Sequence, residues 1–489
     1  MRKILLPVFT LVLSTTCFAQ SKKKAPNILF ILVDDMQGSC IHAYGNNQVY
    51  SPNIDQIVEN GVSFTRTYTN GSLGGALSMP SRAMIMTGRG VYQVLQDGAT
   101  IPEQHVTLPE LLRKNGYTTF AAGKWHSDHK SFNRSFECGE NIFFGGMHSY
   151  QTNGHVSPRL HHYDPTGNYA EKPFIGEKFS SEMFADAAVD FLKSRKKEKK
   201  PFFAFVAFTS PHDPRMQHPD YAHTYKADTL DLPINFLPQH PFDNGDMKVR
   251  DEILIPVPRT EEAVQKELAG YYGMISEVDT QIGRVVQALK ESGQMDNTIL
   301  VFASDNGLAV GQHGLLGKQN LYDHSVRVPL VISVPGMEDK KGVKKDVYCY
   351  LYDIYPTLCD LVGIPTAPSV TGKSLYPVLK GADKHRDCLF LAYNSIQRGL
   401  VKDGWKYIIY NVGGFRTEQL FDLKNDPWEM VNHAQEPAYA FKLAAYKKLL
   451  KEEMEEYNDF CQLDDFFWWD NGEMLPWDDA LKLYTDPNK

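Results

Sequence analysis

Residues 26–35 read PNILFILVDD: a turn, six apolar residues in a row and two aspartates. An unbroken apolar run of this length is typical of a parallel strand that is buried on both faces of its sheet. The pattern recurs at 201–213, where PFFAFVAF precedes TSPHD, and at 298–307, where TILVFA precedes SDNG. A fourth apolar run spans 328–334. These four runs predict the central strands of one sheet.

Helical patterns separate the apolar runs, at 107–115, 180–197 and 261–292. The second of these begins with serines that can cap a helix, and its apolar residues then recur on one face. Strands that alternate with helices predict an α/β fold with a large mixed, mostly parallel sheet flanked by helices. Ligands of such sheets bind beyond the carboxyl ends of the strands, where the polar residues of this chain lie.

The pattern changes near residue 386, where short alternating segments replace the long apolar runs. Four strands are predicted, at 388–393, 399–402, 405–410 and 419–422, and an amphipathic segment at 438–456 predicts a helix. We therefore expect a catalytic domain at 20–385 and a smaller C-terminal α+β subdomain at 386–489, with an antiparallel sheet and one helix. We interpret its aromatic tail, 460–489, as a strap on that subdomain.

The composition is that of a globular chain with a leader segment. Of 489 residues, 42% are hydrophobic, and the formal net charge is −8. The high hydrophobic content excludes a disordered chain. The sequence has no basic stripe of the kind that would indicate a nucleic-acid partner. Residues 1–19 combine Arg2-Lys3, a short apolar run and a small-residue cleavage site, which is the pattern of a secretory signal peptide. We therefore expect an exported, periplasmic protein, with secretion or a lipid anchor as the alternatives. No other run is long enough to span a membrane.

Two pairs of oxygen-bearing side chains follow predicted strands. Asp34-Asp35 end the first apolar run, and Asp305-Asn306 end the third. Carboxylate and amide oxygens are hard ligands, which suit Ca²⁺ or Mg²⁺ better than zinc. Because the carboxyl ends of parallel strands meet at one edge of a sheet, we predict that these residues hold a divalent cation. The alternative is that they only shape surface turns.

Residues 78–89 read SMPSRAMIMTGR and follow a glycine-rich turn at 71–75. Ser78 and Arg82 are four residues apart, so a helix would place a nucleophile and a cation on one face. The same residues also suit an ordinary helix start, with Pro80 in the first turn. The residue pattern alone favours the helix start.

The segment from Ser78 resembles the signature of the formylglycine-dependent sulfatases, (Cys or Ser)-x-Pro-Ser-Arg-x-x-x-x-Thr-Gly, with every fixed position filled. Further segments resemble other motifs of this family and occur in the same order along the chain. They are 26–35, Gly123–His126, Ser210–His212, Ser304–Gly307, His313–Lys318 with Arg327–Pro329, and Leu420–Leu423 with Asp426-Pro427. The resemblance covers nearly the whole chain after residue 19. It implies an alkaline phosphatase-like fold and hydrolysis of a sulfate monoester.

The resemblance also implies a nucleophile and a metal site. A maturation enzyme that accepts serine would oxidise Ser78 to formylglycine, whose hydrate is the family's nucleophile. The family's metal ligands correspond to Asp34, Asp35, Asp305 and Asn306, joined by the oxygen on residue 78. Ca²⁺ is the expected cation, with Mg²⁺ as the alternative.

The remaining roles implied by the resemblance concern charge and proton transfer. Arg82 would hold the hydrate, and Lys124 and Lys318 would bind sulfate oxygens as cations that face an anion. His126 would take a proton from the hydrate as sulfate is expelled, and His212 would protonate the leaving oxygen. His313 would either touch the substrate or only shape its loop.

The sequence leaves the substrate open. A sulfated glycan is expected, and a simple aryl sulfate is the main rival. A phosphomonoesterase or phosphodiesterase of the same superfamily would use Ser78 unmodified, with two zinc ions and more Asp and His ligands than the sequence offers. A non-enzymatic glycan-binding protein is a third alternative. The polar, aromatic segment 147–169, with His148, His155, His161 and His162, suits either a sugar pocket or a solvated loop with incidental histidines.

Overall fold

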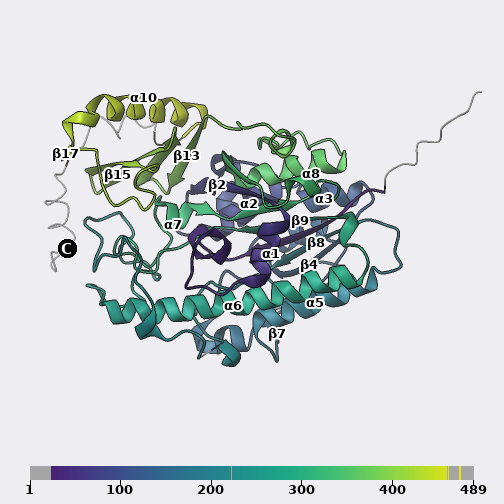
Figure 1. Cartoon of the computed structure of the whole chain (residues 1–489). Coiled ribbons are helices and arrows are strands. Elements are labelled where there is room, and N and C mark those ends of the chain that lie inside the picture. Colours follow the sequence, from purple (N-terminus) through teal and green to yellow (C-terminus); the bar gives the residue numbers. More distant parts are fainter. Residues whose placement is uncertain (1–23, 222, 460, 462–472, 475–489) are drawn as a thin grey trace, which may run out of the picture.

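A computed structural model describes residues 24–221, 223–459, 461 and 473–474 (Figure 1). The predicted signal peptide and most of the predicted strap at 460–489 lie outside the described residues. The described chain forms a large sheet with helices on both faces and a smaller sheet at one end. This confirms the predicted α/β class. Within the described residues, no helix combines the length and the apolar character needed to cross a membrane.

The large sheet has nine strands, most of them parallel to their neighbours. In spatial order they are β10 (Arg327–Val328), β2 (Val62–Tyr68), β11 (Leu330–Ser333), β9 (Thr298–Ser304), β1 (Asn27–Val33), β8 (Phe202–Ala207), β4 (Thr118–Lys124) and β5 (Cys138–Phe143), and β12 (Lys344–Tyr350) pairs with β2. A separate two-stranded sheet joins β6 (Arg159–Leu160) and β7 (Phe174–Ile175). The first apolar run of the sequence is therefore a central strand, with parallel neighbours on both sides.

Helices cover both faces of the large sheet because the side chains of β1 alternate between two cores. Leu29, Ile31 and Val33 belong to the core beneath α1 (Pro52–Asn60), α5 (Ser180–Ser194) and α6 (Glu261–Glu291). Ile28, Phe30 and Leu32 belong to the opposite core, beneath α2 (Ser78–Thr87), α3 (Leu108–Lys114), α8 (Ile354–Val362) and α9 (Tyr376–Leu379). Figure 1 shows α5 and α6 on one side of the sheet and α2, α3 and α8 on the other. The remaining helices are α4 (His129–Ser135), α7 (Asp323–Val326) and α10 (Ala440–Glu456).

The fourth apolar run corrects one expectation about the sheet. Residues 328–334 were expected to form another parallel strand, but β11 runs antiparallel to both β9 and β2. A parallel neighbour requires a crossover connection, usually through a long helix. The only helix in the segment between β9 and β11 is the four-residue α7, and the short strand β10 follows it, so the chain turns back at the same edge of the sheet.

The smaller sheet is antiparallel through β13 (Cys388–Tyr393), β14 (Gln397–Lys402), β15 (Trp405–Val412) and β16 (Phe415–Asp422), as predicted. Its two edge strands, β3 (Gly71–Ser72) and β17 (Glu473–Met474), are parallel to their neighbours. At Gly71, where φ is 105°, a Cβ would lie 1.8 Å from the carbonyl oxygen of Ala392. Only glycine permits this approach, so the turn before Ser78 is fixed to the C-terminal sheet.

Candidate active site

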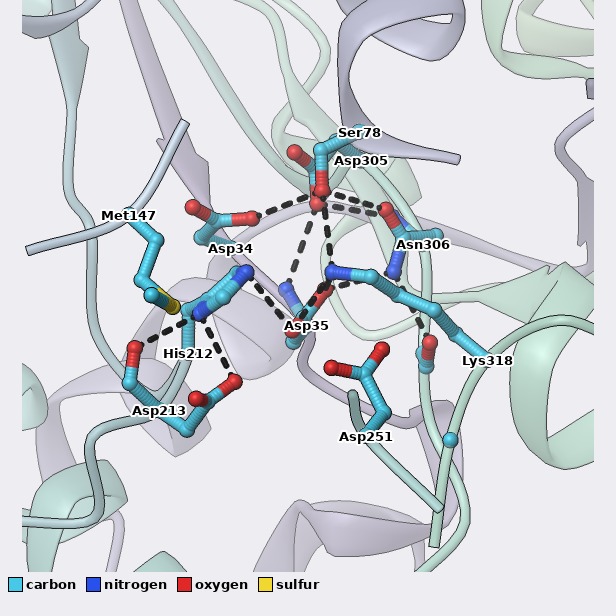
Figure 2. Close-up of polar contacts among 12 residues, drawn as sticks. Asp34, Asp35, Ser78, Met147, His212, Asp213, Asp251, Asp305, Asn306 and Lys318 are labelled. Carbon is cyan, nitrogen blue, oxygen red and sulfur yellow. Dashed lines mark hydrogen bonds and ion pairs between the residues drawn. The ribbon is translucent and has the colours of Figure 1, made fainter. Parts of the chain in front are cut away.

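The ends of two neighbouring strands bring the predicted metal ligands together. Val33 and Ser304, the last residues of β1 and β9, are paired in register. Asp34-Asp35 and Asp305-Asn306 follow directly, and their side chains meet at this edge of the sheet (Figure 2). Asp35 has a φ of 66°, a left-handed conformation that costs a non-glycine residue about 1–3 kcal/mol. Its N–H donates to Asp305 Oδ1 at 3.2 Å, and its carbonyl accepts from Tyr271 at 2.6 Å, which holds this conformation.

Ser78 is the first residue of α2, and its side chain points into the same cluster. Its Oγ lies 3.1 Å from Asp34 Oδ1 and 3.0 Å from Asn306 Oδ1. Lys318 Nζ is 3.3 Å away. The helix start is therefore also the point at which the Ser78 hydroxyl enters the cluster, and its role as the nucleophile stays a prediction.

Two buried lysines pair with two of the carboxylates. Lys124, the last residue of β4, places its Nζ 2.6 Å from Asp34 Oδ2, and Lys318 Nζ lies 2.7 and 2.8 Å from the two oxygens of Asp35. Burial by itself raises the pKa of Asp34, but Lys124 and Arg82 hold it well below its ordinary value. The lysines are thus placed where an anion beside Ser78 would meet them.

Arg82 holds the third carboxylate and the end of β4. Its Nε donates to Asp305 Oδ2 at 2.8 Å, and its Nη1 donates to the carbonyl of Lys124 at 2.9 Å. Burial, together with the neighbouring Asp34 charge, raises the pKa of Asp305 to about 6. A carboxyl group that is crowded by like charge in this way is one that a cation would stabilise in its ionised form.

His212 follows β8 and faces Asp35, with 3.6 Å between Nε2 and Oδ2. Its Nδ1 donates to the carbonyl of Asp213 at 2.7 Å, which leaves Nε2 toward the cluster. Burial alone would lower the pKa of His212, but Asp35 and Asp213 raise it above the ordinary value. The ring is therefore suited to donate a proton from Nε2.

His126 has the opposite electrostatic setting. It follows β4 with a φ of 69°, and burial, followed by the charges of Lys124 and Arg82, lowers its pKa well below the ordinary value. Its Nδ1 has no hydrogen-bond partner among the described residues. A neutral ring of this kind is suited to accept a proton. A Cβ at Gly146 would lie 2.7 Å from Nε2, so a glycine there leaves room for the ring.

His313 lies in a different group of side chains. Its ring stacks on Tyr322 with centroids 4.0 Å apart, and its Nε2 is 3.1 Å from Asn235 Nδ2. These contacts agree with the loop-shaping alternative, and the alternative contact with substrate stays a prediction.

Two histidines of segment 147–169, His148 and His155, belong to the interior, whereas His162 has a 70% exposed side chain. His148 and His155 are 3% and 0% exposed. His155 Nε2 lies 3.0 Å from the carbonyl oxygen of His212, and His148 Nε2 lies 3.1 Å from Thr209 Oγ1. They therefore support the loop that carries His212, a role that sequence reasoning missed. The only sequence signal was the density of histidines before the His212 segment.

The donor set fits a hard divalent cation. Asp34 and Asp35 each offer one carboxylate oxygen, and these two atoms lie within 4.8 Å of one another. Asp305 and Asn306 add a carboxylate and an amide from the adjoining strand. Buried carboxylate and amide oxygens at the end of parallel strands are the ligands that Ca²⁺ and Mg²⁺ prefer.

A serine held among paired carboxylates at the carboxyl edge of this sheet agrees with the expected likeness to the alkaline phosphatase-like superfamily. The chain belongs to the sulfatase family: the family model described as Sulfatase matches residues 26–364. A second model, N-sulphoglucosamine sulphohydrolase, C-terminal, matches 311–459. The protein is therefore a sulfuric ester hydrolase, and family membership implies a formylglycine and a metal.

Named relatives span almost the whole chain. The N-acetylglucosamine-6-O-sulfatase of Bacteroides thetaiotaomicron is 26% identical over 93% of this chain and 91% of its own length. An arylsulfatase of Clostridium perfringens is 28% identical over 88% of this chain and 94% of its own.

Solved structures share the fold. One in complex with its substrate D-glucosamine-2-N,6-O-disulfate has a TM-score of 0.73 at 24% identity, and the match covers 91% of this chain and all (100%) of that one. The phosphonate monoester hydrolase of Agrobacterium radiobacter has a TM-score of 0.69 at 24% identity and covers 88% and 96%. The fold is therefore common to sulfate and phosphonate ester hydrolases.

Proposed function

We propose that the chain removes sulfate from a sulfated glycan, with a formylglycine hydrate derived from Ser78 as the nucleophile and Ca²⁺ as the cation. The surroundings of Ser78 Oγ carry the proposal. Among the described residues, its polar contacts are Asp34, Asn306 and Lys318, none of which is a histidine that could activate an alcohol. An unmodified serine is a weak nucleophile without such a base.

The two groups that maturation and metal binding would supply have defined roles. An aldehyde hydrate supplies a nucleophilic oxygen and a second hydroxyl, through which sulfate can leave by elimination. Asp34, Asp35, Asp305 and Asn306 would hold the cation, which supplies positive charge for the sulfate oxygens. We propose Ca²⁺ before Mg²⁺ because Ca²⁺ accepts the irregular geometry of such oxygen sets more readily.

The side chains of the chain itself account for binding and proton transfer. Lys124 and Lys318 bind sulfate oxygens through charge-assisted hydrogen bonds. Arg82, held by Asp305, keeps the nucleophile in place. The neutral ring of His126 accepts a proton at the nucleophile, and the protonated ring of His212 donates one to the leaving oxygen.

A glycan sulfate is the substrate class that the relatives favour. The relative named N-acetylglucosamine-6-O-sulfatase matches nearly the whole chain, and a fold neighbour was solved with a sulfated glucosamine. The arylsulfatase relative supports the second candidate, an aryl sulfate. We also propose that residues 1–19 direct export to the periplasm and that a serine-specific maturation enzyme is the required partner.

The proposal is tested by mass spectrometry of the peptide that contains residue 78. The protein is produced with and without a maturation enzyme that accepts serine, and Ser78→Ala serves as the matched control. We expect the peptide to lose two hydrogens in active preparations only, and the control to be inactive in both. Full activity with an intact Ser78 hydroxyl would refute the mechanism and favour a phosphatase-like use of the serine.

A further inference from the structure

The tripeptide Arg250-Asp251-Glu252 connects the two sides of the active site. It lies outside helices and strands, in the long connection between β8 and α6. Its three charged side chains contact the His212 segment on one side and the Lys318 loop on the other. None of the three was singled out by the sequence.

On the His212 side, Arg250 acts through Asp213. Both terminal nitrogens of Arg250 donate to the Asp213 carboxylate, Nη2 to Oδ1 at 3.0 Å and Nη1 to Oδ2. A second donor, the Tyr150 hydroxyl, reaches Oδ2 at 3.1 Å. Such a two-pronged contact fixes the plane of the carboxylate as well as its position.

Asp213 in turn fixes the His212 ring. His212 Nδ1 lies 2.7 Å from the Asp213 carbonyl oxygen and 3.1 Å from its Oδ1. With Nδ1 held by two oxygens of one residue, the ring can turn only if Asp213 moves. Arg250 holds one of these two oxygens, Oδ1, and so contributes to the direction in which Nε2 points.

On the Lys318 side, Asp251 and Glu252 hold the loop backbone. Glu252, which is 3% exposed, accepts the N–H groups of Leu316 at 3.0 Å and Gly317 at 2.7 Å. Asp251 Oδ2 accepts from Gln319 Nε2 at 2.8 Å, and Gln319 Oε1 accepts the N–H of Lys318 at 2.9 Å.

The approach between the tripeptide and this loop is close. A Cβ at Gly317 would lie 2.8 Å from Glu252 Oε1 and 3.2 Å from Asp251 Cβ, so residue 317 must be small. Figure 2 shows Asp251 beside Lys318, opposite His212 and Asp213. Arg250 also donates to Asp251 Oδ1, which joins the two halves of the connection.

We propose that Arg250-Asp251-Glu252 is a positioning element, which fixes the proton donor His212 relative to the sulfate-binding Lys318. Arg250 orients His212 through Asp213, and Asp251 and Glu252 fix the loop of Lys318. The inference rests on the proposed sulfatase mechanism, because that mechanism assigns His212 to the leaving oxygen and Lys318 to the sulfate. A displacement of about 1 Å in such an arrangement can cost about 100-fold in rate.

The test compares Arg250→Met with a matched control, Arg284→Met. The two arginine side chains are 41% and 42% exposed and each pairs with an aspartate, but Arg284 pairs with Asp186 between α5 and α6. We expect Arg250→Met to lower kcat by about 30- to 100-fold on a sulfated glucosamine, whose leaving group needs a proton, and by less than about 3-fold on para-nitrophenyl sulfate. Arg250→Lys should lie between the wild type and Arg250→Met, and Arg284→Met should match the wild type.

A second variant and a structural measurement complete the test. Asp251→Ala should raise KM about 10-fold on both substrates, with a smaller change in kcat, because it releases Gln319 and the Lys318 loop. Crystal structures should show the His212 ring turned in Arg250→Met and unmoved in Arg284→Met. An unmoved ring in Arg250→Met, or equal losses on the two esters, would overturn the inference. If the wild-type protein cleaves no sulfate ester, the proposed function fails. The position of the His212 ring in the crystal structures still tests the positioning role of Arg250 in that case.

Discussion

Replacing His212 by Ala should separate substrates by the basicity of their leaving groups. The His212 ring is 7% exposed in its side chain, its Nδ1 is committed to Asp213, and its Nε2 faces the site 3.6 Å from Asp35. Although burial lowers the pKa of His212, the charges of Asp35 and Asp213 raise it above its ordinary value, which favours the protonated ring. General acid catalysis by such a group contributes roughly 10²–10⁴-fold, or about 3–5 kcal/mol of barrier at 1.36 kcal/mol per decade.

The full loss applies only where the leaving oxygen needs that proton. A sugar alkoxide does, so kcat/KM on a sulfated glucosamine should fall by about 10²–10⁴-fold, whereas para-nitrophenolate leaves with little protonation and should lose less than about 10-fold. Steady-state kinetics on both esters measures the difference. His385→Ala is the control, because His385 has a 6% exposed side chain and lies 3.1 Å from the carboxylate of Asp353, outside the cluster around Ser78. Equal losses on the two esters would show that His212 is not the proton donor.

Three other perturbations have defined outcomes. Chelation should abolish turnover and added Ca²⁺ should restore it; full activity of a metal-free preparation would exclude the metal's proposed role. Gly123→Ala should lower the free energy of unfolding, measured in urea, by at least about 2 kcal/mol more than the control Gly116→Ala does. Both glycines have a φ near 90°, so the backbone strain is matched. Only at Gly123 would a Cβ clash, 1.9 Å from the Ala207 carbonyl oxygen. Burial raises the pKa of Glu277 from 4.5 to about 8, so the folded state keeps a proton that the unfolded chain releases. The free energy of unfolding of the wild type should therefore fall as the pH rises from about 5 to 8. Its slope should be steeper than that of Glu277→Gln by up to about 1.4 kcal/mol per pH unit. Equal slopes in the two proteins would contradict this.

Local patterns predicted the parts of the fold that depend on local chemistry. The run that became β1 is apolar at every position because both of its faces are covered by helices. The direction of β11 was predicted wrongly, because it depends on how the chain between β9 and β11 returns to the sheet and not on the residues of the strand. The inclusion of Gly71–Ser72 in the C-terminal sheet was missed because a strand of two residues is too short to show an alternation of apolar and polar residues.

The candidate site divides in the same way. Asp34-Asp35 and Asp305-Asn306 could be placed together because each pair directly follows a strand, and the resemblance to the sulfatases added the lysines and histidines. Arg250 could not be found in this way, since its part depends on contacts with Asp213 and Asp251 that an irregular segment makes only in the folded chain. A charged residue in a loop has the same sequence pattern whether it is solvated or holds a catalytic group.

Under the proposed mechanism, the charges of the site would link metal binding to sulfate binding. Asp34, Asp35 and Asp305 are balanced by Arg82, Lys124 and Lys318, and all six side chains are almost fully buried. Each lysine donates to an aspartate at 2.6–2.8 Å. A divalent cation bound by these aspartates would compete with the ammonium groups for the same oxygens, so it would add two positive charges and release lysine charge toward a substrate. Because binding free energies are reciprocally linked, a sulfate ester bound to those lysines must then raise the affinity for the metal by the same factor. Chelation should accordingly weaken the binding of sulfate esters as well as slow their turnover.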